Sequence, residues 1–128
     1  MPLPDDVAAL LRAPNIAHLA TVLPDGGPHA VPIWVGVRDG RIAFLTSPNS
    51  RKARNIARDP RVAISVADHE HPNRMAHVRG RVVEVLDGDR GWEVIDALSQ
   101  DYIGTRYPWR ADRAAYLVEP QRAWAQQF

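Results

Sequence analysis

The chain has 128 residues, of which 45% are hydrophobic and 24% charged, and its formal net charge is +1. These values predict one soluble globular domain, residues 1–128, large enough to bury a hydrophobic core without covalent cross-links. The absence of cysteine excludes disulfides, thiolate catalysis and cysteine zinc sites. No apolar stretch could span a membrane and the acidic N-terminus is unlike a signal peptide, so we expect a cytoplasmic protein without a membrane partner. The small net charge argues against a nucleic-acid partner.

The N-terminal part of the chain predicts a helix and a pair of strands. Residues 4–11 have acidic residues at the helix start and leucines at helical spacing. Residues 16–22 are apolar enough for a strand, and the proline- and glycine-rich stretch 24–28 predicts a turn. Residues 29–37 alternate β-branched and other side chains, which predicts a second strand. Pro32 cannot donate to a neighbouring strand, so we expect it at an edge or a bulge.

The central part predicts two more strands around a short helix. Residues 38–41 contain Asp-Gly, which is typical of a hairpin turn, and residues 42–46 alternate as a third strand. Ser50 is a favourable N-cap for a helix that ends before Asp59-Pro60. Residues 62–66 then alternate as a fourth strand.

The C-terminal part predicts a long strand, a helix and a last strand. Residues 76–85 alternate with a change of phase that predicts a bulge near Gly80, after which Val83 and Val85 take the apolar positions. Residues 90–102 carry apolar side chains at helical spacing, ended by Gly104. Residues 114–124 form a last strand interrupted by proline. Mostly antiparallel, short strands with few helices predict a mainly β protein, a small barrel with peripheral helices.

The stretch 44–56 has the composition of an anion site. A strand end is followed by a polar loop and a helix start, whose first N–H groups lack partners within the helix. Ser47 and Ser50 can donate hydroxyl hydrogens, and Arg51 and Lys52 can neutralise charge. Lys52 is the only lysine in the chain. The alternative is an ordinary serine-capped helix with a solvated arginine face, and the local residues alone do not decide between the two.

The order and spacing of several segments resemble the pyridoxamine 5′-phosphate oxidase-like split β-barrel superfamily. The resemblance rests on residues 16–22, 25–28, 31–34, 46–56 and 59–62, and on the later segments 80–82 and 102–108. It spans nearly the whole chain and is closest to the small flavin/deazaflavin oxidoreductases that use coenzyme F420. It implies a six-stranded antiparallel split barrel that forms a homodimer, with two cofactor sites at the subunit interface.

The resemblance also implies which residues bind the cofactor. The hydroxyls and cations of the 46–52 stretch would hold its phosphate, and the strand around Pro32 with Leu45 would lie against its ring. Two residues of the long strand, Met75 and His77, would come from the partner subunit, with Arg79 as a further candidate. The full set is Pro32, Ile33, Trp34, Leu45, Thr46, Ser47, Ser50, Arg51, Lys52, Asn55, Met75 and His77.

The activity implied by the resemblance is hydride transfer from reduced F420 to an unsaturated small molecule. The arginine-rich composition is typical of GC-rich actinobacterial genomes, in which F420 is common, and favours it over FMN. The alternatives are an FMN-dependent oxidoreductase, a protein that carries or stores the cofactor without turnover, and a haem-binding or haem-degrading relative. The substrate stays open, as does the catalytic acid, for which Tyr102, Tyr107, His77 and solvent are the options.

The histidines at 69, 71 and 77 invite a metal interpretation. Two of them lie in a proline-containing turn without a rigid frame for tetrahedral ligands. We therefore expect a solvated loop and no metal site.

Overall fold

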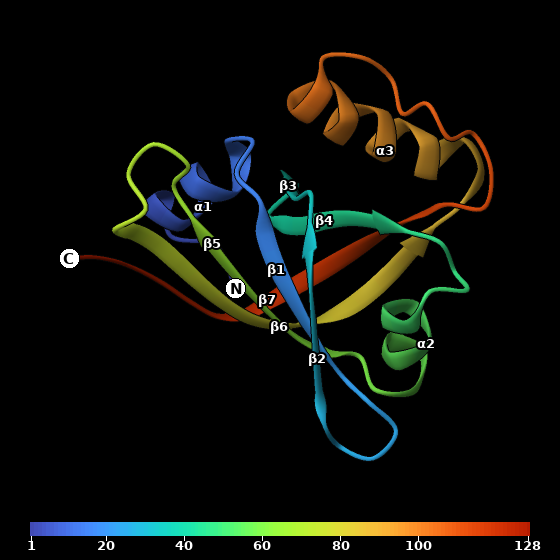
Figure 1. Ribbon diagram of the computed structural model, residues 1–128, viewed down its shortest axis with the longest axis horizontal. Helices are drawn as coiled ribbons and strands as arrows, with labels where there is room; N and C mark the ends of the chain where they lie inside the picture. Colours follow the sequence, from blue (N-terminus) through green and yellow to red (C-terminus); the bar gives the residue numbers. More distant parts are fainter.

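The computed structural model describes residues 1–128 and consists of a seven-stranded sheet with three helices (Figure 1). The elements, in chain order, are α1 Asp5–Arg12, β1 Ala17–Val22, β2 Pro28–Ile33, β3 Gly36–Arg38, β4 Arg41–Thr46, α2 Arg51–Arg58, β5 Arg61–Ala67, β6 Arg74–Leu86, α3 Gly88–Ile103 and β7 Ala114–Gln127. This mainly β architecture with peripheral helices confirms the predicted fold class.

The sheet has the strand order β2-β1-β5-β6-β7-β4-β3, and every neighbouring pair is antiparallel. It is split rather than closed, because β2 and β3 form its two edges. The expected six strands become seven because the single strand predicted over 29–37 is interrupted at Trp34 and Val35. The Val35 N–H donates to the Tyr102 hydroxyl at 3.0 Å instead of to another strand.

β6 and β7 are the longest strands, at 13 and 14 residues, which confirms the long strand predicted around residues 76–85 and makes β7 longer than the strand predicted over residues 114–124. Their register shifts between Arg79 and Gly80, which confirms the predicted bulge, and again between Val82 and Glu84. The extra residue at the first shift, Gln121, lies on β7, so β6 keeps one alternation of inward and outward residues, and Val83 and Val85 are 46% and 51% exposed. They are not the inward-facing residues that the sequence pattern predicted.

The hydrophobic core has two parts on opposite sides of the curved sheet. The larger part lies inside the curl, where α1 packs over β3, β5, β6 and β7, and Phe44 stacks on Tyr116 with ring centroids 5.2 Å apart. The smaller part lies under α3, which packs against β4 and β7 through Ile95 and Leu98. α2 is the short helix beside β1, at the end of β4 (Figure 1).

The local signals for turns and helix ends hold in the structure. Asp39 and Gly40 both have positive φ, 51° and 78°, as a tight hairpin turn with the sheet's twist requires. The Ser50 side chain caps α2, and Gly104 ends α3 in the left-handed conformation. No helix is both long and apolar enough to cross a membrane.

The edge position of β2 explains its two prolines. Pro28 and Pro32 are exposed and pair in register with Val22 and His18 of β1. β2 has no strand on its other side, which confirms the edge position predicted for Pro32.

We expect Gly80→Ala to destabilise the fold, because a Cβ at this bulge would lie 2.4 Å from the Glu119 carbonyl oxygen, a backbone atom that cannot move aside. Overpacking of this kind typically lowers the free energy of unfolding by about 1–3 kcal/mol, which urea denaturation measures. The matched control is Gly27→Ala, whose nearest neighbour is the movable Asp25 carboxylate at 3.0 Å. Equal loss of stability in the two variants would contradict the prediction.

Candidate functional site

The turn between β4 and α2 leaves one hydroxyl hydrogen without a protein partner. The Ser50 Oγ accepts hydrogen bonds from the Thr46 hydroxyl at 2.9 Å and from the Ala53 N–H at 3.2 Å. These two bonds use both lone pairs of the oxygen, so the serine hydrogen is available to donate outward. The first backbone N–H groups of α2, at Arg51 and Lys52, have no partner within the helix. The turn therefore presents several free donors, which suits an anion.

Two cations stand at this turn without an acidic partner. Lys52 is partly buried, and its burial together with the positive charge of Arg113 lowers the pKa of its ammonium group. Neither residue takes part in any of the six salt bridges of the structure. Arg113 is instead held by the Asp112 carbonyl at 2.8 Å and the Tyr107 hydroxyl at 3.3 Å. A phosphate placed here would relieve the repulsion between the two cations.

Lys52 also lines a pocket with a volume of about 380 Å³. The other walls are apolar or aromatic, and they come from the ends of β2 and β4, the residue before β1 and the loop after α3. These residues are Ile16, Pro32, Ile33, Trp34, Leu45 and Tyr107. The pocket thus joins apolar and aromatic walls to a cationic corner, a combination that suits a ring bearing a phosphate.

The aromatic wall is built from residues far apart in sequence. The Trp34 ring stacks on Tyr102 of α3, with ring centroids 5.2 Å apart and planes 11° apart, and meets Tyr107 edge-on at 6.1 Å. The loop after α3 is fixed in turn by Asp96, which accepts from the Tyr107 N–H at 3.0 Å and from Arg110 at 2.6 Å. Trp34 is therefore held in place from two sides.

Tyr102 is a structural clamp and not a free proton donor. Its hydroxyl donates to the Asn15 carbonyl at 2.6 Å and accepts the Val35 N–H at 3.0 Å. Burial raises the pKa of Tyr102 above its usual value, so the phenol stays protonated. These bonds tie α3 to the break between β2 and β3, where Trp34 lies.

The remaining residues expected at the phosphate lie close to the turn with different contacts. The Ser47 hydroxyl donates to the Asp112 carboxylate at 2.7 Å, which connects the β4–α2 turn to the start of β7. Arg51 is exposed on α2. Asn55 is fully buried, with its side-chain N–H donating to Thr21 at 3.0 Å, and it does not line the pocket.

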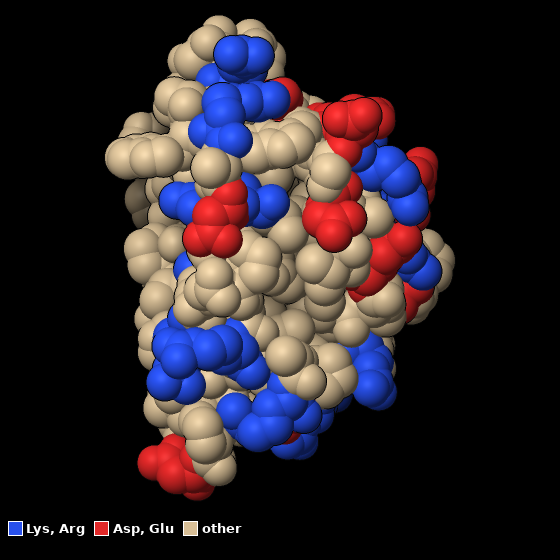
Figure 2. Space-filling model, turned by 90° about the vertical axis from the view of Figure 1, so that its right-hand side faces the viewer, with Lys and Arg blue, Asp and Glu red and all other residues tan.

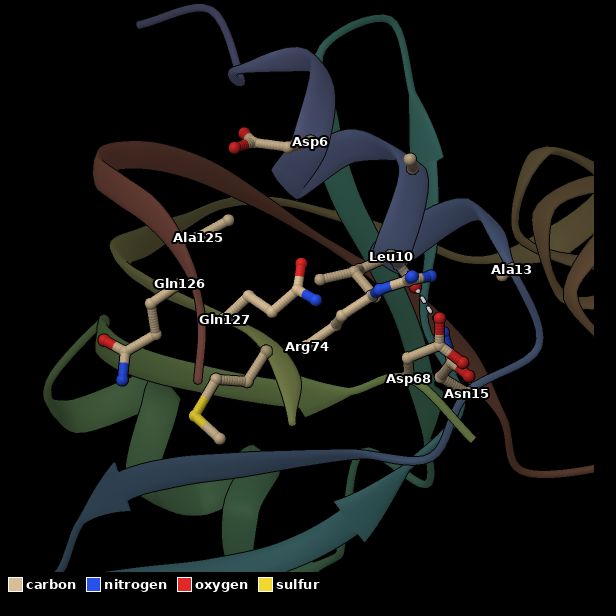
Figure 3. A pocket seen from close by; sticks show the side chains of 11 residues that line it. Asp6, Leu10, Ala13, Asn15, Asp68, Arg74, Ala125, Gln126 and Gln127 are labelled. Carbon is tan, nitrogen blue, oxygen red and sulfur yellow. Dashed lines mark hydrogen bonds between the residues drawn. The ribbon is translucent and has the colours of Figure 1, made fainter. Parts of the chain in front are cut away.

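Met75 and His77 do not line the pocket that contains Lys52. His77 stacks on Trp124 of β7, with ring centroids 5.1 Å apart. Met75 lines a separate hollow of about 450 Å³ between α1 and the ends of β6 and β7 (Figure 3). That hollow contains no aromatic side chain. One of its polar groups is already engaged, because the Glu70 and His71 N–H groups hold the pKa of Asp68 below its usual value.

Two residues of the pocket, Ile16 and Tyr107, escaped the sequence-based site assignment, as did Arg113, the cation beside Lys52. Tyr107 was considered only as an acid, and Arg113 not at all. Arg113 reaches the β4–α2 turn because Ala114 pairs with Thr46 in the β4–β7 ladder. A pairing of strands so distant in sequence gives no local signal, so only a correct strand order could have revealed it.

We expect Tyr102→Phe to lower the free energy of unfolding by about 1–3 kcal/mol, because it leaves the Val35 N–H and the Asn15 carbonyl without their partner. Tyr116→Phe is the matched control. Burial also raises the pKa of Tyr116, but its hydroxyl makes no hydrogen bond to another residue. Thermal unfolding of both variants measures the difference, and a control variant as unstable as Tyr102→Phe would contradict the clamp.

Comparison with known proteins identifies relatives along the whole chain. The family model described as pyridoxamine 5′-phosphate oxidase matches residues 3–127. A pyridoxine/pyridoxamine 5′-phosphate oxidase from Nostoc punctiforme is 42% identical over 103 residues, which cover 80% of this chain and 44% of that protein. The chain therefore spans less than half the length of this curated relative.

Among solved structures, an F420 reductase superposes with a TM-score of 0.83 at 32% identity, covering 95% of this chain and 98% of that one. A FAD-binding protein from Mesorhizobium loti superposes with a TM-score of 0.72 at 19% identity, covering 96% and 93%, and shows a shared fold. The family model matches residues 3–127, and the split antiparallel sheet agrees with that match. This chain belongs to the pyridoxamine 5′-phosphate oxidase family.

Proposed function

We propose that the protein is an F420-dependent oxidoreductase, which transfers a hydride from the reduced deazaflavin to an unsaturated small molecule. The observation that carries the proposal is a pocket with aromatic walls that is also lined by Lys52, next to which Arg113 adds a second positive charge, neither cation having a salt bridge. A cofactor with a flat ring system and a phosphate satisfies both parts of this site at once. The residues present fit such a group.

The side chains of the site would act by binding and positioning. Ser50 and the first N–H groups of α2 would donate to the phosphate, while Lys52 and Arg113 would neutralise its charge. Trp34, with its ring fixed by stacking on Tyr102, would hold one face of the cofactor ring. Pro32 and Leu45 would keep water away from the ring edge.

The bound deazaflavin would supply the hydride chemistry, which is why the site needs few reactive side chains of its own. Tyr102 is committed to the Asn15 carbonyl, so an acid from this chain would have to be another group. Tyr107 lines the pocket, and its hydroxyl accepts from Arg113 while keeping its own hydrogen to donate. We propose Tyr107 or solvent as the proton source.

F420 is favoured over FMN by the similarity to the F420 reductase, which covers nearly the whole of both chains. An FMN-dependent enzyme of the same fold is the alternative, because FMN also joins a flat ring to a phosphate. A carrier or storage protein for the same cofactor is a second alternative, since the site as described is built for binding.

We propose that two copies of the chain complete each site. The pocket is formed by one chain, while Met75 and His77 do not line it and could approach the ring only from a second copy. Sedimentation equilibrium with and without cofactor tests this arrangement. A protein that stays monomeric when saturated with cofactor would exclude it.

We expect Lys52→Gln to weaken F420 binding by roughly tenfold to a hundredfold, because one charge-assisted contact to the phosphate is lost. Fluorescence titration of the protein with F420, and in parallel with FMN, measures the affinities. Arg54→Gln is the matched control, because this exposed arginine lies on the same helix and does not line the pocket. Unchanged affinity in Lys52→Gln would rule out the proposed phosphate site, and tighter binding of FMN would favour the alternative cofactor.

A turnover assay distinguishes the proposed oxidoreductase from a protein that only carries or stores the cofactor. Reduced F420 is mixed with a panel of enones and quinones, and its reoxidation is followed by absorbance. An enzyme oxidises it faster than the protein-free mixture does. Tight binding without any acceleration would favour the carrier.

The pKa of Lys52 provides a further check, since the chain has only two amines, Lys52 and the N-terminus. Burial and Arg113 lower this pKa below 10.5, so anion binding should decline as the pH rises through the lowered value. Arg113→Gln should move the pKa upward, and so should added phosphate. NMR of the ¹³C-methylated amines follows the titration. A Lys52 pKa that is insensitive to both changes would contradict the shared site.

A further inference from the structure

We propose that the outer face of β5, β6 and β7 binds a small polyanion, a chain of two or more phosphate or carboxylate groups. The site is a cluster of four exposed arginines, called here the arginine cluster: Arg61, Arg79, Arg81 and Arg122. Arg79 is also the further candidate from the partner subunit at the cofactor, whereas Arg61, Arg81 and Arg122 are not expected there, so the proposal goes beyond the cofactor site.

The strand register sets these arginines directly opposite one another. Arg61 of β5 pairs with Arg81 of β6, and Arg79 of β6 pairs with Arg122 of β7. Paired residues of antiparallel strands share a face of the sheet, with Cβ atoms about 5 Å apart, and like charges in such pairs are destabilising. Two like-charge pairs side by side therefore carry a penalty that the fold itself does not require.

Acidic side chains do little to offset this penalty. Arg61 has an acidic partner, Asp59, at 2.7 Å, and Arg81 lies opposite Glu119 of β7 in the strand register without a salt bridge to it. Arg79, Arg81 and Arg122 take part in no salt bridge, although the chain as a whole has nearly balanced charge at +1. Positive charges are thus concentrated on this face of the sheet. On the side of the molecule that carries α2, Figure 2 shows basic side chains both at the top and in the lower half, and most acidic ones in the upper half.

A hollow of about 560 Å³ adjoins the cluster. Arg61 and Arg79 line it together with Gln121 and with the small residues of the β1–β2 turn. Glycine and alanine at its floor leave space in front of the guanidinium groups. The hollow shares no lining residue with the aromatic pocket that contains Lys52.

The geometry of the sheet limits the ligand. Neighbouring strands are about 4.8 Å apart, and residues two positions along a strand are about 6.8 Å apart. One phosphate can therefore meet one arginine pair, whereas a chain of two or three anionic groups can meet both. Bidentate contacts with guanidinium groups favour phosphate or carboxylate oxygens.

The test is isothermal titration of the full chain with tripolyphosphate and, separately, with citrate. Arg81→Gln and Arg122→Gln each remove one member of a pair, and neither residue is expected at the cofactor. We expect each variant to bind the better of the two anions roughly tenfold more weakly. The control is Arg12→Gln, which changes an exposed arginine on α1. Its affinity for the anion should stay within about twofold of that of the native chain, because distant exposed charges are screened by salt. Tighter binding of tripolyphosphate identifies a phosphate chain, and tighter binding of citrate a polycarboxylate.

Thermal unfolding adds a readout that charge loss alone would not give. Without anion, Arg81→Gln and Arg122→Gln should unfold at the same temperature as the native chain or higher, because repulsion is relieved. Addition of the anion should raise the unfolding temperature of the native chain more than that of either variant. Unchanged affinity in both variants would overturn the proposal. So would displacement of tripolyphosphate by FMN, which would make the cluster part of the cofactor site, or tighter binding of a single-stranded oligonucleotide.

Discussion

The pairing of β6 with β7 is the constraint on which the rest of the fold depends. These two strands run side by side along the length of the molecule, and their register shifts at Gly80, opposite Pro120. A bulge increases the local twist and bends the strand. The bend turns the β7–β4–β3 side of the sheet back toward β1 and β2, and one sheet thereby encloses the core around Phe44 without closing into a full barrel.

The candidate site lies along the seam that this incomplete closure leaves. Its walls come from both ends of the strand order, from β2 on one side and β4 on the other. The Tyr102 hydroxyl, between Asn15 and Val35, fixes the β2 side of the seam, and the Ser47–Asp112 hydrogen bond continues the β4–β7 pairing on the other side. A ring in the pocket would thus be held by elements that the sheet itself does not hydrogen-bond together.

The sequence was sufficient for features that depend on nearby residues. The Asp39-Gly40 turn, the Ser50 cap, the Gly80 bulge and the Gly104 helix end each have a signal within a few positions, and each is present. The resemblance supplied the fold class and brought Pro32 and Leu45 together with Lys52 in advance of the structure.

What the sequence could not supply depends on contacts between distant segments. The strand predicted over 29–37 breaks at Val35 because a tyrosine 67 residues away takes its N–H. Arg113 joins Lys52 only through the β4–β7 pairing, and Val83 is exposed because the extra residue near Gly80 lies on β7, which leaves the alternation of β6 unchanged. Periodicity describes one strand at a time, so it detects neither a competing hydrogen bond nor a register set by the neighbouring strand.

The prolines of β2 have a consequence for how this protein can meet another copy of itself. Alternate N–H groups of a strand point to the same side, so residues 28, 30 and 32 share one side of β2, and prolines there are tolerated only where that side faces away from β1. Two of the three outward donors are therefore missing, and Ala30 alone keeps one. An approaching strand would find almost no ladder to join, so this edge resists the sheet-to-sheet addition that leads to aggregation. A copy of the chain that approached this edge would therefore meet side chains and not a hydrogen-bonding strand.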